Sequence, residues 1–328
     1  MEDKFFEVKR KHHYVWADYL KRWSTDGINV FHTTPTRKIS LDSVRGLAMN
    51  IDFYKITKLS EYDIKVILAW SSKSAEDLQE AHKSYLSDFV RFQTSIDLYN
   101  KSGKVDELVD KSIRALESKL LENLHSAHER KASLILKELA VGNLPILYEN
   151  NHILSFTSFL GHQFSRTKNL KDRVFENNNV ADPEMAALCN SMRNSWWFIS
   201  YMIGMNLGRE LYLFRSRYTH ALLKNETSVP FITSDQPVIN IHPQVWGEPS
   251  SSPECLDLYY PINPTYAYVI AESDTYSGGQ VLVTPKQVKE LNMKMAARSK
   301  VNIVGISKDS LRPLVPYIGL SKISSDCL

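Results

Sequence analysis

Cysteine is scarce in this 328-residue chain, which has only three, and no Cys-x-x-Cys pair occurs. Cys189, Cys255 and Cys327 are odd in number and widely spaced. A disulfide framework and a thiolate zinc site are therefore disfavoured, and a reducing cytoplasm is the compartment that we expect.

Several motifs that mark well-known enzyme classes are missing from the sequence. There is no G-x-x-x-x-G-K-[ST] loop and no G-x-G-x-x-G fingerprint. A P-loop nucleotide hydrolase and a standard dinucleotide-binding fold are therefore disfavoured. The absence of H-E-x-x-H likewise disfavours a zincin protease.

The chain also lacks a hydrophobic run long enough to span a bilayer. The most apolar segment, residues 196–207, has twelve residues, whereas a transmembrane helix needs roughly 20. The first sixteen residues are charged throughout and contain no apolar stretch of signal-peptide length. We therefore expect a soluble cytoplasmic protein with no membrane partner and a buried helix at 196–207.

Neither sign of charge dominates, since 40 basic and 37 acidic residues leave a net charge of +3. This balance neither demands nor excludes a nucleic-acid partner, because a local basic face can occur within a neutral total. Basic residues cluster at 9–11 and along 209–224. If these stretches converge beside His12 and Arg166, the cationic pocket would suit a nucleic acid or a phosphorylated small molecule. A solvated charged surface is the simpler explanation. The sequence leaves the oligomeric state open.

The first 58 residues have the pattern of a short helix followed by strands. Residues 12–24 place apolar side chains at helical spacing. Residues 28–32 and 37–41 alternate like the two strands of a hairpin, and 50–57 has the pattern of a further extended segment.

Residues 59–225 have an overwhelmingly helical pattern. Ser60 and Asp63 resemble a helix-start capping arrangement, and Gly142 is expected in a left-handed C-cap. The helices that we predict cover residues 74–99, 105–141, 151–164 and 183–223, with a polar loop at 167–182.

After residue 226 the pattern changes to short apolar runs separated by proline and glycine. The predicted strands are 229–235, 237–241, 258–262, 266–273 and 301–307, with one helix at about 285–299 and a surface loop at 247–255. We therefore expect an α+β fold with N-terminal short strands, a long mainly helical middle and a C-terminal mainly antiparallel sheet with one helix. Because both ends have strand patterns, residues 1–328 are predicted to form a single composite domain with the parts 1–58, 59–225 and 226–328.

Two short polar motifs lie near opposite ends of the chain, His12-His13-Tyr14 and the TSDQP sequence at 233–237. Both have apolar neighbours, and their polar groups are costly to bury without a partner. If the two motifs meet, they bring imidazole and carboxylate together, which are the usual groups of proton transfer or metal binding.

These motifs are part of a wider resemblance. HHYVWADYL at 12–20 resembles the opening of the bacterial family named domain of unknown function 4238, which usually has His-His-Tyr-Val-Pro-Gln-x-Tyr-Leu there. Further resembling segments follow in the same order: IDFYKI (51–56), SFLGHQFSRT (158–167), FITSDQPV (231–238), YYPINP (259–264) and VKELNMKMAARSKVNIVG (288–305). Trp16-Ala17 replaces the family's Pro-Gln, so any role of that glutamine is absent here. The resemblance indicates which residues to test for a functional role, but it does not indicate which reaction they would perform.

The histidine pair supplies the first candidate catalytic residues. Adjacent side chains point in different directions, so His12 and His13 are not expected to bind one metal ion together. Either one alone suits a general base, a general acid or a ligand, because the imidazole pKa lies near 6.5. The resemblance favours that role, with Tyr14 as a substrate-binding neighbour. The alternative is a histidine that caps a helix or bonds a buried carbonyl.

Asp235 is the candidate catalytic carboxylate, because it ends an apolar strand where the chain opens towards loops that often carry catalytic groups. The sequence S-D-Q-P is also a good turn, in which Asp235 or Ser234 accepts backbone N–H bonds. Ser234 is a candidate substrate contact and not a nucleophile, because the G-x-S-x-G elbow is absent.

Gln163 and Arg166 end an apolar helix just before the polar stretch at 167–182. A guanidinium there would clamp a phosphate or carboxylate with two hydrogen bonds, which makes both residues substrate-binding candidates. Equally, Arg166 would satisfy the free carbonyls at the end of the helix.

Glu122, His125 and Glu129 are spaced three and four residues apart and share one face of a predicted helix. Such a face binds metals in helical bundles, although a single E-x-x-H copy gives weak support for a di-metal site. A solvated face with i,i+4 pairs is the simpler expectation. Glu129 is the acid that we expect to turn inward and join the catalytic residues, because apolar residues such as Leu124 surround it.

The sequence leads to a phosphodiester-handling enzyme, most plausibly a nuclease acting on RNA or DNA and working as a bacterial toxin or phage-defence effector. His12 or His13 would transfer the proton, and Arg166 would stabilise phosphate charge. Asp235, with Glu129, would orient the histidine or hold a divalent cation such as Mg²⁺ or Mn²⁺. The alternatives are a non-catalytic sensor of an anion, nucleotide or nucleic acid, and a structural or interaction protein.

Overall fold

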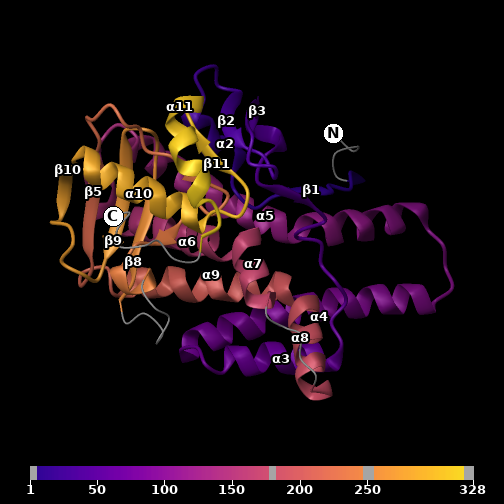
Figure 1. Cartoon of the computed structure of the whole chain (residues 1–328). Helices are drawn as coiled ribbons and strands as arrows, with labels where there is room; N and C mark the ends of the chain where they lie inside the picture. The colour runs from indigo at the N-terminus through magenta and orange to yellow at the C-terminus, as the bar shows by residue number, and fades with distance from the viewer. Residues whose placement is uncertain (1–5, 177–181, 247–254, 321–328) are drawn as a thin grey trace.

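The computed structural model describes residues 6–176, 182–246 and 255–320 of the chain. It is an α+β structure in which a long helical region lies between short N-terminal strands and a C-terminal sheet, as the sequence predicts (Figure 1). The asparagines expected in a loop at 177–179 and nearly all of the surface loop expected at 247–255 lie outside the described residues.

The histidine motif forms a strand, whereas the spacing of apolar residues at 12–24 predicts a helix. β1 (Lys11–His13) pairs antiparallel with β4 (Met49–Ile51). Helical structure begins only at α2 (Ala17–Leu20) and continues through the 3-10 turn η1 (Lys21–Trp23). The helix prediction over 12–24 is therefore wrong at its start, because pairing with a distant strand overrides the local apolar spacing.

The predicted N-terminal hairpin is confirmed, and it belongs to a sheet with strands from both ends of the chain. β2 (Asn29–Thr33) pairs antiparallel with β3 (Ile39–Ser43). β2 also pairs with β11 (Ile303–Gly305), which in turn pairs with β6 (Thr233–Ser234). The strand order is β3-β2-β11-β6, so the segment that precedes Asp235 lies in one sheet with the N-terminal hairpin.

The helical middle begins with the predicted capping box, in which Ser60 and Asp63 cap α3 (Glu61–Ser71). Gly142 follows the longest helix with a φ of 91°, the left-handed conformation expected there. α4 and α5 form a long antiparallel pair that projects from the rest of the molecule (Figure 1). The further elements are α4 (Glu76–Lys101), α5 (Glu107–Leu139), η3 (Leu144–Tyr148), α6 (Asn150–Ser165), α7 (Lys168–Phe175), α8 (Pro183–Asn194) and α9 (Trp196–Leu213).

Two segments of the middle differ from the sequence prediction. Residues 168–175 form α7 and not a loop, and the side chain of Thr167 caps that helix. Residues 219–224 form β5 (Thr219–Lys224) and do not extend the helix predicted at 183–223, because strands pair with β5 on both sides. A short apolar run such as Ala-Leu-Leu does not distinguish a strand from a buried helix.

The C-terminal region forms a five-stranded sheet in the order β10-β5-β9-β8-β7. Its neighbours are antiparallel except β10 and β5, which are parallel. The helix α10 covers one face, whereas Phe156 of α6 packs against Tyr268 on the other. The elements of this region are β7 (Ile239–Asn240), η4 (Pro243–Val245), β8 (Asp257–Pro261), β9 (Tyr266–Ala271), β10 (Gly279–Leu282), α10 (Pro285–Arg298), α11 (Lys308–Leu311) and η5 (Arg312–Tyr317).

The run of apolar residues at 196–207 lies in α9, which is the buried helix expected from the sequence. In the part of the chain that the structure describes, no helix is both long and apolar enough to cross a membrane.

α6 and α9 pack so closely that their backbones touch. A Cβ atom added at Gly161 of α6 would collide with the carbonyl oxygen of Gly204, and one at Gly208 would lie 2.8 Å from the Cα of Ser158. Glycine is required at these positions because no other residue leaves room for the opposing backbone. A Cβ at Gly204 would also collide with the ring of His162, so this approach shapes the space around that histidine.

Candidate functional site

The strand β1 directs His12 into the interior, where both of its ring nitrogens bond to the backbone. Nδ1 accepts the Tyr54 N–H at 2.8 Å, and Nε2 donates to the Lys9 carbonyl at 2.7 Å. The ring is fully buried and stacks on Tyr54. His12 therefore fastens β1 to the Asp-Phe-Tyr segment, and neither nitrogen is available to a substrate in this arrangement.

His13 points to the opposite side of the strand, because alternate residues of a strand face opposite ways. Its Nε2 donates to the Arg45 carbonyl at 3.1 Å, in the 3-10 turn η2 (Val44–Gly46), which leaves Nδ1 as the nitrogen with a free lone pair. Among the described residues Nδ1 has no hydrogen-bond partner. Burial lowers the pKa of His13 below 6.5, although the Arg45 carbonyl opposes that shift. The ring is therefore neutral near pH 7 and able to accept a proton.

His13 lines a polar cavity of about 240 Å³. The cavity lies between β1, the start of α2, one face of α5 and the end of α6. Its lining residues are Lys9, His13, Trp16, Ala17, Glu122, His125, Ser126, Glu129 and Arg166. Three residues singled out in the sequence, His13, Glu129 and Arg166, thus meet in one place although they come from three separate segments.

Arg166, the C-cap residue of α6, joins the walls of this cavity. Its guanidinium bonds to Glu129 Oε1 at 2.7 Å and to Gln163 Oε1 at 2.5 Å. Gln163 in turn donates to the Tyr14 carbonyl at 3.0 Å. Burial is the largest influence and would lower the pKa of Arg166, but Glu129, Tyr54 and Tyr260 together outweigh it and the pKa is raised. Arg166 is therefore charged, and its buried Nε has no partner in the structure.

The face of α5 that lines the cavity points inward, which corrects the expectation of a solvated face. Glu122 and His125 are only 7% and 2% exposed, and the Glu129 side chain is 12% exposed. The segment before β1 and the end of α6 cover this face, and Lys9 pairs with Glu122 at 2.7 Å. The solvated-face prediction is wrong because the covering segments are far away in sequence.

His125 forms part of the cavity floor, and neither of its buried ring nitrogens bonds to any residue that the structure describes. Behind it, the rings of His128 and His162 lie 4.1 Å apart between centroids, and His162 packs against Tyr201 at 4.4 Å. Burial lowers the pKa of His128 to about 4, and it lowers the pKa values of His125 and His162 well below 6.5. These three imidazoles are consequently neutral at pH 7.

Asp235 lies in a different place and makes three backbone hydrogen bonds. Its carboxylate accepts the N–H groups of Lys300, Val301 and Asn302 at 2.7–3.0 Å. Burial raises its pKa despite these bonds. No hydrogen bond or ion pair joins Asp235 to His12 or His13 among the described residues. The structure therefore does not join Asp235 to either histidine, although burial and, after it, the Asp235 charge raise the pKa of Tyr14. Asp235 holds the loop before β11 in place.

Ser234 shapes the turn that contains Asp235. Its hydroxyl accepts the Gln236 N–H at 3.1 Å and donates to the Gln236 carbonyl at 3.0 Å. This is the turn arrangement that the S-D-Q-P sequence indicates. It places Ser234 in the interior, away from the residues that line the cavity.

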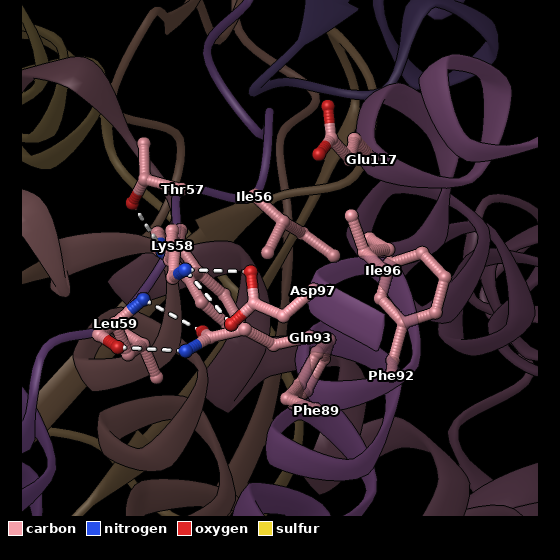
Figure 2. Close-up of a pocket in the computed structure, with 11 residues that line it drawn as sticks. Ile56, Thr57, Lys58, Leu59, Phe89, Phe92, Gln93, Ile96, Asp97 and Glu117 are labelled. Carbon is pink, nitrogen blue, oxygen red and sulfur yellow. Dashed lines mark hydrogen bonds and ion pairs between the residues drawn. The ribbon is translucent and has the colours of Figure 1, made fainter. Parts of the chain in front are cut away.

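A second pocket, of about 60 Å³, lies between the linker before α3 and α4 (Figure 2). There Lys58 pairs with Asp97 at 2.6 Å, and Gln93 bonds the backbone of Leu59 through both amide atoms. Figure 2 shows these contacts fastening the linker to the helix, while Phe89 and Phe92 supply an apolar wall. The pocket is small, and the side chains of Lys58, Gln93 and Asp97 are already paired, which favours a structural role.

Sequence reasoning does not single out several of the cavity residues. Lys9 was grouped with a basic stretch and received no role of its own. His162, which lies behind the cavity floor, also received no role although it lies within the SFLGHQFSRT segment. Trp16 and Ala17, which replace Pro-Gln of the resembling family, line the cavity directly. Among the described residues, no group of three or more His, Cys, Asp or Glu side chains is arranged to hold a metal ion.

Comparison with known proteins gives one match. A family model described as "Protein of unknown function" (DUF4238) matches residues 11–309. No curated protein and no solved structure matches the chain. The matched region contains His13, Glu129 and Arg166, and also the turn with Asp235. The chain therefore belongs to the DUF4238 family.

Proposed function

We propose that the protein cleaves phosphodiester bonds in RNA or DNA and that the cavity between β1, α5 and α6 is its active site. One observation supports this most strongly. His13 is a neutral imidazole whose Nδ1 has no hydrogen-bond partner within the described part of the chain, and it shares the cavity with the cations Lys9 and Arg166. A base that takes a proton and cations that stabilise phosphate charge are groups that this reaction uses.

His13 would act as the general base. Its Nδ1 would take a proton from the attacking oxygen, a water or a ribose 2′-hydroxyl, as that oxygen forms its bond to phosphorus. The bond to the leaving oxygen then breaks, and the leaving oxygen takes a proton from solvent at the open rim of the cavity. The Arg45 carbonyl holds the other nitrogen of His13 and stabilises the imidazolium that forms.

Lys9 and Arg166 would stabilise the negative charge that grows on the phosphoryl oxygens. Each is held by a glutamate, Lys9 by Glu122 and Arg166 by Glu129. The glutamates fix the direction of the cations before substrate arrives, which supports electrostatic preorganisation.

A second candidate is an anion-binding sensor without catalysis. The specific observation in its favour is that both cations already have a carboxylate partner, so the cavity has little net charge to stabilise a reaction. In that case Lys9 and His13, the more accessible basic side chains of the cavity, would bind an anion without cleaving it.

Cleavage of labelled RNA and DNA by the wild type, His13→Ala and His152→Ala tests the proposal, with Mg²⁺, Mn²⁺ or EDTA in parallel. We expect His13→Ala to lower the rate by about 10²–10⁴, as for loss of a general base, and His152→Ala to leave it unchanged. His152 is a matched control because it lies on α6 outside the cavity. The EDTA arm decides whether a divalent cation takes part.

If the wild type cuts no substrate, or if His13→Ala cuts at the wild-type rate, the enzyme proposal is wrong. Saturable oligonucleotide binding without cleavage, weakened by Lys9→Gln, would favour the sensor.

A further inference from the structure

A cavity on another side of the α6 terminus contains two arginines and no acidic residue. It measures about 310 Å³ and lies between α7, the edge strand β7 and the end of α10. The lining residues are Phe164, Asn169, Leu170, Arg173, Gln236, Val238, Ile239, Asn240, Val245, Leu256 and Arg298. The volume is at the lower end of the roughly 300–1,000 Å³ of small-molecule pockets.

The two arginines have no carboxylate partner. Among the described residues, no Asp or Glu oxygen lies within ion-pair distance of Arg173 or Arg298. The acids of α7 are engaged elsewhere, since Asp172 pairs with Lys168 and Lys300, and Glu176 also pairs with Lys300. Besides burial, the charge of Arg173 lowers the pKa of Arg298, so the two cations repel each other, and the more distant Glu176 offsets the charge of Arg173 only in part. An anion bound between the arginines would relieve this repulsion.

Arg298 is held in a fixed position. Its guanidinium donates to the Val245 carbonyl at 2.9 Å and lies over the Trp246 ring at 4.3 Å from the centroid. Burial and the charge of Arg173 lower the pKa of Arg298 to about 10, so it remains charged at pH 7. Such an arginine is oriented in advance for an anion, which limits the entropy lost on binding.

The amide groups of the cavity are occupied by the wall itself. Asn169 donates to the Arg298 carbonyl, Gln236 donates to the Val238 carbonyl, and Asn240 accepts the N–H of Asp257. These bonds leave the arginines as the groups that recognise charge. The remaining lining is apolar and consists of the aromatic ring of Phe164 and of aliphatic side chains such as Leu170.

We propose that this cavity binds a small organic anion, in which a carboxylate or phosphate group on an apolar or aromatic body lies between Arg173 and Arg298. The proposal does not depend on the nuclease activity, because the cavity shares no lining residue with the one that contains His13. The apolar wall takes the body of the ligand, and the two guanidinium groups take its charged end.

Isothermal titration calorimetry with 1-naphthyl phosphate and 1-naphthoate tests this proposal and distinguishes the two anionic groups. We expect saturable one-to-one binding of at least one of them, and binding at least tenfold weaker for 1-naphthol and for inorganic phosphate alone. Arg173→Gln should weaken binding by about tenfold or more, as for a lost charge-assisted hydrogen bond. Arg91→Gln is the matched control, because Arg91 is exposed on α4 and does not line the cavity.

Arg173→Gln is the decisive variant, because Arg173 is exposed and its replacement leaves the hydrogen bond between Arg298 and Val245 intact. Leu170→Trp provides an independent test, since a larger side chain in the cavity should abolish binding while both arginines remain. The proposal is overturned if neither anion binds, if 1-naphthol binds as tightly as the anions, or if Arg173→Gln and Leu170→Trp both bind like the wild type.

Discussion

Arg166 and Glu129 form an ion pair of 2.7 Å between side chains that are only 2% and 12% exposed. The pair connects α6 to α5 at the floor of the cavity, and Gln163 extends it to the backbone of Tyr14. A charge pair in such a place costs desolvation energy and is retained only where geometry or function requires it. Replacing residues of the pair and of the cavity distinguishes a structural requirement from a functional one.

Glu129→Gln should destabilise the protein by about 3–5 kcal/mol, because it leaves the buried guanidinium of Arg166 without its counter-charge. Urea unfolding at pH 7.5 measures this change in the free energy of unfolding. The double variant Glu129→Gln with Arg166→Met should recover most of the loss, since no buried charge then remains. If the single variant is as stable as the wild type, water reaches Arg166 and the pair is not buried in solution.

Replacing His12 should lower the stability of the protein more than replacing His13 does. His12→Ala leaves the Tyr54 N–H and the Lys9 carbonyl without their partner, so we expect a loss of about 1–3 kcal/mol in the free energy of unfolding. His13→Ala removes one partly exposed bond and should cost less than about 1 kcal/mol. Thermal and urea unfolding of both variants, side by side, check this order. The reverse order would contradict the assignment of His12 to structure and His13 to chemistry.

Stability should fall in mild acid because of the buried histidines. Burial lowers the pKa of His128 to about 4, whereas an unfolded histidine titrates near 6.5. Between these values the unfolded chain binds more protons than the native one, so the free energy of unfolding decreases as the pH falls from about 6.5 towards 4. His128→Gln removes one such group and should make the decrease between pH 7.5 and 5.0 smaller.

Urea unfolding of the wild type and His128→Gln at these two pH values provides the comparison, with the surface variant His152→Gln as control. An equal decrease in wild type and His128→Gln would show that His128 titrates normally in the folded state.

Gly161→Ala should destabilise the protein by about 2 kcal/mol or more, since its Cβ would collide with the carbonyl of Gly204 and force α6 and α9 apart. Gly46→Ala is the matched control, because nothing lies within 4 Å of a Cβ at that position. Thermal unfolding of the two variants measures the difference. A wild-type melting temperature for Gly161→Ala would mean that the helices are further apart than described.

The parts of the fold that local signals specify could be predicted from the sequence. The long helices, the capping box at Ser60 and the left-handed Gly142 all follow from spacing and residue type within a few positions. β1 and β5 were missed because their identity depends on distant pairing partners. The same limit applies to α7, whose polar sequence resembles a loop although Thr167 caps it.

The candidate site could be predicted only in part, for a similar reason. His13, Glu129 and Arg166 were identified as separate candidates, but the sequence does not show that they share one cavity. The inward position of Glu122 and His125 depends on Lys9 and α6, which a helical pattern alone does not contain. Asp235 was a reasonable choice by residue type, and its contacts with the backbone of 300–302 became visible only in the structure.

The dependence of cleavage rate on pH, measured in single turnovers for the wild type and His13→Ala, tests the central claim most directly. A neutral His13 is required as base, and burial lowers its pKa below 6.5. The wild-type rate should therefore rise with pH and level off below pH 7, whereas His13→Ala should be slow and show no such rise. A variant that keeps the wild-type rate and profile would contradict the claim that His13 takes the proton.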